Sequence, residues 1–155
     1  MKRLVIISLF LIAGLARAQE SPTFFTISVP NMDETVAWYQ TMFDMETIRI
    51  PPLDTVASIA VLRNKGLMVE VIEHKGSAPV ERYVPGLNRR FLIHGLFKVG
   101  FFVRNIDEWV ARLERKGAKF RGGLVEDKLN RVRTILVLDN NGNIIQLFEK
   151  FPDTR

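Results

Sequence analysis

Two stretches of this chain repeat each other at a sequence offset of 74. Residues 31–39 and 105–113 are identical at five of nine positions, and both open with Asn-x-Asp-Glu. A second match runs at an offset of 76 and pairs 61–66 with 137–142 and Glu73 with Glu149. Because a repeated segment is one supersecondary unit, a repeat constrains the architecture more than any single residue does. The chain is therefore predicted to hold two copies of one unit, whose equivalent positions meet across a pseudo-twofold axis.

The segment 1–18 has the layout of a secretory signal peptide. A charged start at Lys2-Arg3 precedes an apolar run over 4–15, and Ala16-Arg17-Ala18 places small residues where a signal peptidase reads. The run is shorter than the roughly 20 residues that span a bilayer, which argues against a retained anchor. Cleavage before Gln19 is expected, so the protein is predicted to be exported, periplasmic or secreted, with no membrane contact afterwards.

The charge of the chain gives little support for nucleic-acid binding. Three of the 22 basic residues lie in the predicted signal, so the mature chain 19–155 keeps 19 of them beside all 17 acidic residues. A net charge of +2 without a dense basic patch is not typical of a nucleic-acid-binding protein. The absence of cysteine excludes disulfides, thiolate metal ligands and a cysteine nucleophile. One compact domain over 19–155, stabilised by packing, is expected.

The first copy, module one (23–75), has the periodicities of a β-α-β-β-β unit. Asn31 is a predicted N-cap with Glu34 three residues on, and apolar residues then recur at helical spacing over 32–43. Alternating and β-branched runs predict strands at 24–29, 47–50, 56–62 and 67–73. The last two strands are joined at Asn64-Lys65-Gly66, which is a turn signal.

The second copy, module two (98–150), has the same order of elements. Asn105 and Glu108 form the equivalent capping box for a helix over 106–116. Strands are predicted at 99–103, 118–120, 134–138 and 143–148. Between the modules, 76–97 is a linker punctuated by Pro and Gly, and a connection of this length inside a compact domain is often functional.

Three stretches carry a resemblance to a known family. They are Val29-Pro-Asn-Met-Asp-Glu-Thr-Val-Ala-Trp-Tyr39, Val103-Arg-Asn-Ile-Asp-Glu-Trp-Val-Ala-Arg-Leu113 and Leu138-Asp-Asn-Asn-Gly-Asn-Ile-Ile-Gln-Leu147. Over residues 24–150 the chain resembles the vicinal oxygen chelate family, which includes glyoxalase I, bleomycin-resistance proteins and extradiol dioxygenases. The resemblance implies an α+β fold in which two tandem β-α-β-β-β modules form a cupped eight-stranded mixed sheet around a cavity. It implies no single activity, because one fold hosts many functions.

The resemblance also implies where metal-dependent relatives hold their metal, at the start of each module's first strand and on each module's last strand. In this chain those positions are Phe24, Glu70, Lys98 and Gln146. Only Glu70 is a usual ligand, since Phe24 offers no lone pair and the ammonium of Lys98 competes with a cation. We therefore expect no metal and no cofactor. An enzymatic role is disfavoured, with Glu70 as the candidate catalytic residue if the chain has one.

The period of two along a strand predicts which side chains line the cup. If the helices cover the side of Ile27 and Val29, the alternate residues of each strand face the cavity. The predicted ligand-binding residues on that face are Glu70, Lys98, Gln146, Phe24, Phe102, Met68 and Phe148. A mainly apolar lining with a few polar groups is typical of a small-molecule pocket.

Glu70 and Lys98 are expected within direct or one-water reach on this face, as an ion pair in place of the metal. Two interpretations stay open: the pair orients a polar group of a ligand, or it neutralises two half-buried charges. Gln146 either binds the ligand or satisfies that pair. Two functions follow. One is metal-independent binding or sequestration of a small, partly apolar molecule, and the other is a glyoxalase- or dioxygenase-like lyase or isomerase based on Glu70.

The remaining aromatic and imidazole side chains give weaker signals. His74 is expected to face solvent, and His94 lies in the linker near the pocket mouth. Trp38 and Tyr39 continue the core face of their helix. Trp109 is expected to be the exposed aromatic residue, and it marks a candidate interface for a homodimer.

Overall fold

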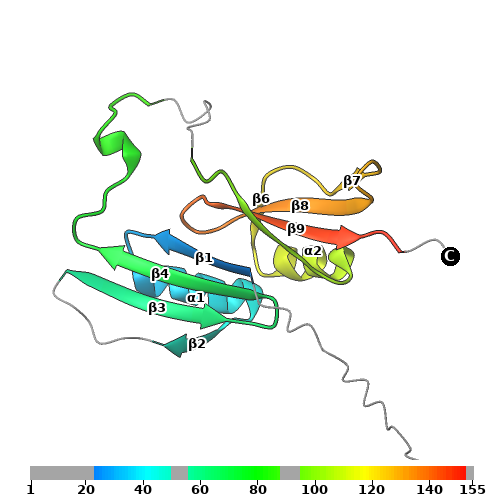
Figure 1. Ribbon diagram of the computed structural model, residues 1–155, viewed down its shortest axis with the longest axis horizontal. Helices are drawn as coiled ribbons and strands as arrows, with labels where there is room; N and C mark the ends of the chain where they lie inside the picture. The colour runs from blue at the N-terminus through cyan, green and yellow to red at the C-terminus, as the bar shows by residue number, and fades with distance from the viewer. Residues whose placement is uncertain (1–22, 50–55, 88–94, 153–155) are drawn as a thin grey trace, which may run out of the picture.

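Both modules predicted from the repeat are present, each as one helix packed on one mixed sheet (Figure 1). The computed structural model describes residues 23–49, 56–87 and 95–152. The predicted signal peptide, its cleavage position before Gln19, and His94 lie outside the described residues. Among the described helices, none is long and apolar enough to cross a membrane.

Module one forms a four-stranded sheet with the strand order β1-β4-β3-β2. Its elements are β1 (Thr23–Ser28), α1 (Met32–Phe43), β2 (Glu46–Arg49), β3 (Ala57–Arg63) and β4 (Leu67–His74). β1 runs parallel to β4, whereas β3 is antiparallel to both of its neighbours. The helix occupies the residues predicted for it, and the strand ends shift only slightly from the predicted bounds, as is usual at element ends.

Module two repeats this arrangement as β5-β9-β8-β6, with β7 as an additional strand paired to β8. Its elements are β5 (Val99–Phe102), α2 (Ile106–Arg115), β6 (Lys119–Phe120), β7 (Val125–Asp127), β8 (Val132–Leu138) and β9 (Ile144–Lys150). The sequence predicted eight strands, but neither β7 nor the 3₁₀ helix η1 (Val80–Arg82) in the linker. Each is three residues long, and a periodicity cannot be recognised over so few positions.

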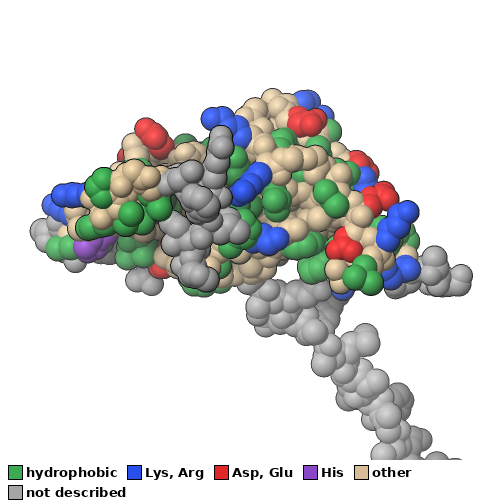
Figure 2. Space-filling model, turned by 90° about the horizontal axis from the view of Figure 1, so that it is seen from above, with side chains coloured by type: hydrophobic (Ala, Val, Ile, Leu, Met, Phe, Trp, Pro, Cys, Tyr) green, Lys and Arg blue, Asp and Glu red, His purple; other side chains and the backbone are tan. Residues whose placement is uncertain are grey.

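The face seen in Figure 2 carries charged side chains of both signs, scattered around areas of hydrophobic side chains. This distribution agrees with the modest net charge that the chain has without the predicted signal.

The repeated glutamates bind the N-termini of the two helices. Each Asn N-cap accepts the backbone N–H three residues on, at 3.1 Å in module one and 3.3 Å in module two. From the last strand of each module, Glu73 accepts the N–H of Met32 at 2.8 Å and Glu149 accepts the N–H of Ile106 at 3.2 Å. A carboxylate is favourable there because the first N–H groups of a helix lack partners and carry positive potential. This part of the repeat is therefore structural.

The hairpin turns of the two modules differ in length by one residue. Arg63 pairs with Met68 across the first turn, whereas Leu138 pairs with Ile144 across a turn one residue longer. β3 and β8 are consequently equivalent at an offset of 75, and the offset of 76 inferred from the matching turn residues is wrong for these strands. A one-residue slip would turn buried side chains outward, so the strands keep their register and the turn absorbs the extra residue.

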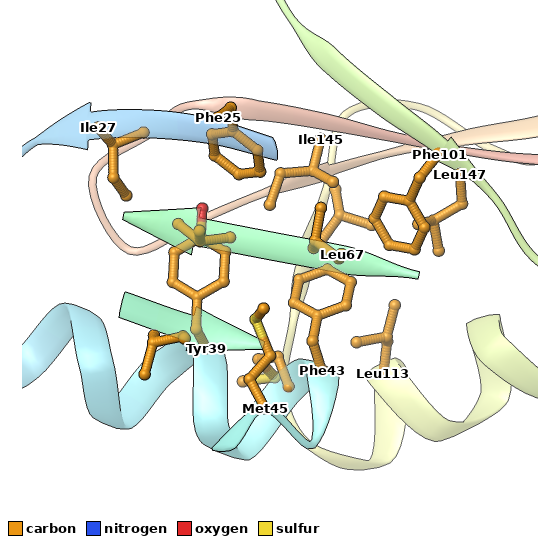
Figure 3. Close-up of a cluster of buried hydrophobic side chains, with 14 of the residues drawn as sticks. Phe25, Ile27, Tyr39, Phe43, Met45, Leu67, Phe101, Leu113, Ile145 and Leu147 are labelled. Atoms are coloured by element: carbon orange, nitrogen blue, oxygen red, sulfur yellow. The ribbon is translucent and has the colours of Figure 1, made fainter. Parts of the chain in front are cut away.

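A continuous hydrophobic core joins the modules, with side chains of β1, β5 and β9 pointing toward those of α1 and α2 (Figure 3). Tyr39 is buried and Trp38 packs partly buried beside it, as predicted. Phe43 lies 5.8 Å from Phe101 and 6.0 Å from Trp109 between ring centroids. The expectation that Trp109 is exposed was wrong, because its ring packs half-buried against these two rings. A homodimer stays a prediction, but an exposed Trp109 no longer supports it.

Polar side chains also join the modules, and we call Thr35, Tyr39, Asp139, Asn140 and Asn141 the polar latch. The hydroxyl of Tyr39 on α1 donates to Asp139 Oδ2 at 3.1 Å, across 100 residues of sequence. The side-chain amides of Asn140 and Asn141 donate to Thr35 Oγ1 at 3.2 and 2.9 Å. Burial, and secondly the neighbouring Asp139 carboxylate, raise the pKa of Tyr39 well above its ordinary value. The turn between β8 and β9 is thereby fixed against α1.

Candidate functional site

Each sheet has one face that the helices leave open. Along β1, Phe25 and Ile27 are buried in the core, whereas Phe24, Thr26 and Ser28 are exposed on the opposite side. The predicted alternation is therefore confirmed for β1, and we call the side of the sheets that carries Phe24, Thr26 and Ser28 the open face. Burial of the alternate apolar residues against a helix fixes which side chains remain available to a ligand.

Glu70 lies on the open face of β4, opposite Thr26 of β1. The Thr26 hydroxyl donates a 2.9 Å hydrogen bond to Glu70 Oε2, and Glu70 is half-buried. Lys98 precedes β5, and its side chain is exposed. Within the described part of the chain no ion pair joins Glu70 to Lys98. The expected direct contact does not form, because Lys98 lies before the strand and remains in solvent. Contact through one water stays a prediction.

Gln146 of β9 is a deeply buried polar group of the open face, with 7% of its surface exposed. Its Nε2 donates to Thr134 Oγ1 at 2.6 Å. Its Oε1 is buried and has no hydrogen-bond partner among the described residues. A buried acceptor without a donor costs about 1–3 kcal/mol. The amide oxygen of Gln146 is therefore an acceptor for a donor supplied by a ligand or by water.

A hollow of about 430 Å³ lies at the end of the open face in module two, and we call it the aromatic hollow. Phe102 and Phe148 oppose each other on β5 and β9, with ring centroids 5.4 Å apart. Lys150 Nζ lies 5.3 Å from the centre of the Phe102 ring, and Val132 and Phe151 extend the apolar lining. Such a floor offers a flat apolar surface beside a positive charge.

The shape of the aromatic hollow depends on Gly100. A Cβ at this position would lie 2.6 Å from Cε2 of Phe148, so only glycine lets the Phe148 ring lie across β5. The rim is polar, with Asp127 and Asn130 following from β7. Hydrogen bonds from Asn130 lower the pKa of Asp127, which is therefore ionised at neutral pH.

The structure brings only some of the predicted ligand-binding residues together at the aromatic hollow. Phe102 and Phe148 line the aromatic hollow, whereas the other five do not: Phe24, Met68, Glu70, Lys98 and Gln146. Sequence reasoning missed Asp127 and Lys150. The alternation along β9 was sufficient to find Lys150, which follows Gln146 and Phe148 on the same face. Asp127 carries no such signal, because β7 was not recognised.

The residues at the four implied metal positions do not fit a metal ion. One carboxylate and one neutral amide are the only oxygen donors among them, and the other two positions are Phe24 and the exposed Lys98. Within the described ranges, no group of three His, Cys, Asp or Glu side chains is arranged so that it could hold a metal ion. This donor set is not the one that divalent transition metals prefer. What the open face offers is hydrogen bonding and apolar contact.

The sequence model of the Glyoxalase/Bleomycin resistance protein/Dioxygenase superfamily matches residues 22–147. The chain therefore belongs to this superfamily, as the resemblance implied. No curated protein matches the sequence.

Solved structures share this fold at low sequence identity. A glyoxylase/bleomycin resistance protein/dioxygenase domain from Frankia sp. EAN1pec is 19% identical with a TM-score of 0.62, covering 83% of this chain and 90% of that one. TioX from Micromonospora sp. ML1 is 20% identical with a TM-score of 0.61, covering 84% and 99%. The E126Q mutant of the fosfomycin resistance protein FosX from Listeria monocytogenes, complexed with Mn(II) and 1S,2S-dihydroxypropylphosphonic acid, is 15% identical with a TM-score of 0.60, covering 84% and 92%. The α+β architecture of paired modules is thereby confirmed.

Proposed function

We propose that this protein binds or sequesters a small, partly apolar molecule on its open face without a metal ion. The observation that carries the proposal is the aromatic hollow, which offers the facing rings of Phe102 and Phe148 beside Lys150. The unpartnered Oε1 of Gln146, two residues from Phe148 on the same face, adds a buried hydrogen-bond acceptor. An apolar lining with a few placed polar groups is what a small-molecule site requires.

The hollow favours a ligand with a planar or branched apolar body. The body would lie against the two rings that line the hollow. A negatively charged or electron-rich substituent would be favoured near Lys150. The FosX mutant in the comparison holds Mn(II) with its ligand, whereas the donor set here lacks the groups for such a site.

Export is part of the proposal. The charged start, the apolar run over 4–15 and the small residues of Ala16-Arg17-Ala18 support removal of the segment 1–18 by a signal peptidase. The protein would then act in the periplasm or outside the cell, where a carrier or sequestering protein meets molecules before they enter. A homodimer is compatible with this role.

Native mass spectrometry of the purified mature protein tests the binding function, together with elemental analysis of the same sample. We expect a small organic molecule to be released on denaturation and well under one equivalent of Zn, Ni, Mn or Fe. Phe148→Ala should lower the retained ligand at least fivefold. Tyr83→Ala, which removes an aromatic ring exposed elsewhere in the linker, should leave it unchanged. Stoichiometric metal, or equal retention by both variants, would refute the proposal.

A second candidate function is catalysis by Glu70, and one observation favours it. Glu70 is half-buried on the open face with Oε2 bonded to Thr26, while no described group bonds Oε1. Such a carboxylate is able to take a proton from a bound molecule. Incubating the released molecule with wild type and with Glu70→Gln, followed by mass spectrometry, separates the functions. Conversion by wild type alone supports a lyase or isomerase, and binding without conversion by either supports the carrier.

A further inference from the structure

A second hollow, of about 790 Å³, lies between the modules on the side of α2, and we call it the intermodule groove. It separates the turn between β3 and β4 from α2 and the end of β5. Its walls include Asn64, Lys65, Arg104, Trp109 and Arg112, with Phe102 shared with the aromatic hollow. None of the four residues at the implied metal positions lines this groove.

The two hairpin turns differ in their contact with the helix of the other module, and the groove lies on the side where that contact is missing among the described residues. On one side, the longer turn after β8 is fixed to α1 by the polar latch. On the other side, the shorter turn after β3 makes no described hydrogen bond to α2. Its Asn64 instead donates from Nδ2 to the carbonyl oxygen of Phe43 at 2.9 Å, at the end of α1. The place that the latch fills on one side is therefore open on the other.

The charges that line the groove are mainly positive. Lys65 on the turn and Arg104 after β5 are exposed and form no ion pair with any described residue. Arg112 is paired with Asp44, which also accepts from Lys116 Nζ at 2.7 Å. The carboxylate of Asp44 is thus already neutralised by two cations. Three cations and one carboxylate leave an excess of positive charge, which attracts an anion.

On the side of α2, the wall of the groove is formed by the guanidinium of Arg112 lying over the ring of Trp109. The guanidinium of Arg112 lies 4.0 Å from the centre of the Trp109 ring, and Trp109 is braced by Phe43 and Phe101 behind it. A guanidinium that lies over a ring and is paired with a carboxylate is able to stack a further planar group. On the opposite lip, Gly66 has no side chain, and the space beside its Cα is open, with no heavy atom within 4 Å of where a Cβ would be.

We propose that the intermodule groove is a second binding site, for a planar organic anion such as an aromatic carboxylate. The carboxylate lies between Lys65 and Arg104, and the ring lies against the Arg112 and Trp109 wall. The site shares Phe102 with the aromatic hollow and is otherwise lined by different residues, so we expect an anion and the carried molecule to bind together.

Fluorescence of Trp109 gives a direct readout of this site. The chain has two tryptophans, and Trp38→Phe leaves Trp109 as the only one. The probe is 4-nitrobenzoate, a planar anion that quenches tryptophan, and the uncharged comparison is 4-nitrobenzyl alcohol. We expect saturable quenching by the anion and at least fivefold weaker binding of the alcohol. Isothermal titration of the wild-type protein repeats the measurement if Trp38→Phe does not fold.

Paired charge variants locate the anion. Lys65→Gln with Arg104→Gln should weaken 4-nitrobenzoate binding at least tenfold. Arg82→Gln with Lys128→Gln removes the same charge from exposed positions outside the groove and should change binding less than twofold. Equal loss in both pairs, or equal binding of the alcohol, would overturn the proposal.

Phe148→Ala separates the two sites. The substitution removes a ring of the aromatic hollow that does not line the intermodule groove, so 4-nitrobenzoate should bind it as it binds wild type. If Phe148→Ala abolishes anion binding, the anion occupies the aromatic hollow. That result overturns the second site and leaves the proposed carrier function standing.

Discussion

Replacing Tyr39 by Phe measures how strongly the polar latch holds the two modules together. The change removes only the hydroxyl that donates to Asp139 Oδ2 and keeps the buried ring. A hydrogen bond to a charged group contributes about 1.5–3 kcal/mol. The lower half of that range applies, because Asp139 Oδ2 also accepts from Asn143 Nδ2 at 2.8 Å and is not left unpaired. We expect the free energy of unfolding to fall by about 1.5–2 kcal/mol at neutral pH.

Because of the same hydroxyl, the stability difference between wild type and Tyr39→Phe should disappear at high pH. The pKa of Tyr39 is raised by burial and by Asp139, so the folded protein keeps this proton while the unfolded chain loses it above pH ~10. The unfolded state then binds fewer protons, and stability falls with pH by up to about 1.4 kcal/mol per unit for this group. Tyr39→Phe has no such proton to lose. Its deficit relative to wild type should therefore shrink above pH ~10 and vanish near pH ~11.5.

Urea unfolding followed by circular dichroism at pH 7, 9, 10, 11 and 11.5 gives both results in one series. Tyr83→Phe is the matched control, since Tyr83 is the other tyrosine in the chain and is 67% exposed. It should match wild type throughout. The reasoning is wrong if Tyr39→Phe equals wild type at pH 7, or if its deficit stays constant from pH 7 to 11.5.

Three further predictions follow from the ion pairs, the helix caps and the signal. Lys98→Ala should change the free energy of unfolding by less than about 1 kcal/mol, because its side chain is exposed and unpaired with Glu70; a loss of about 3 kcal/mol would place the pair in contact. Glu73→Ala should cost about 0.5–1 kcal/mol in urea unfolding, since the Met32 N–H loses its acceptor, and Glu73→Gln should recover part of it. Intact-mass analysis of exported protein should show Gln19 at the N-terminus, and a soluble chain that keeps residues 1–18 would contradict export.

The candidate site shows how far sequence reasoning reached. Alternation along β1, β5 and β9 placed Phe24, Phe102 and Phe148 on the open face, because the period of a strand is set by the covalent geometry of the backbone. It did not show that Phe102 and Phe148 make a hollow while Glu70 lies away from it. That division depends on β7 and its turn, which form only by pairing with β8.

The expected direct contact between Glu70 and Lys98 shows what sequence reasoning could not predict. The family resemblance and the period of the strands placed both residues on the same face, but they could not place side-chain atoms. Thr26, directly opposite Glu70, supplies the nearest donor, whereas Lys98 lies outside the strand that would have held it in reach. Long-range polar contacts depend on distances of a few tenths of an ångström, which a pattern of residue types does not contain.

The sequence alone determined the two modules, both helices with their Asn caps, and the grouping of side chains by face along β1, β4, β5 and β9. These features are local or repeated, and each is set by hydrogen bonds and periodicities within a few residues. Only the tertiary structure decided the polar latch from Tyr39 to Asp139 and the intermodule groove on the opposite side. The second hairpin turn, which is one residue longer than the first, contacts a helix 100 residues away in the chain, whereas the first turn makes no described hydrogen bond to α2. The physical reason is that packing between distant segments selects one of the arrangements that the local pattern allows.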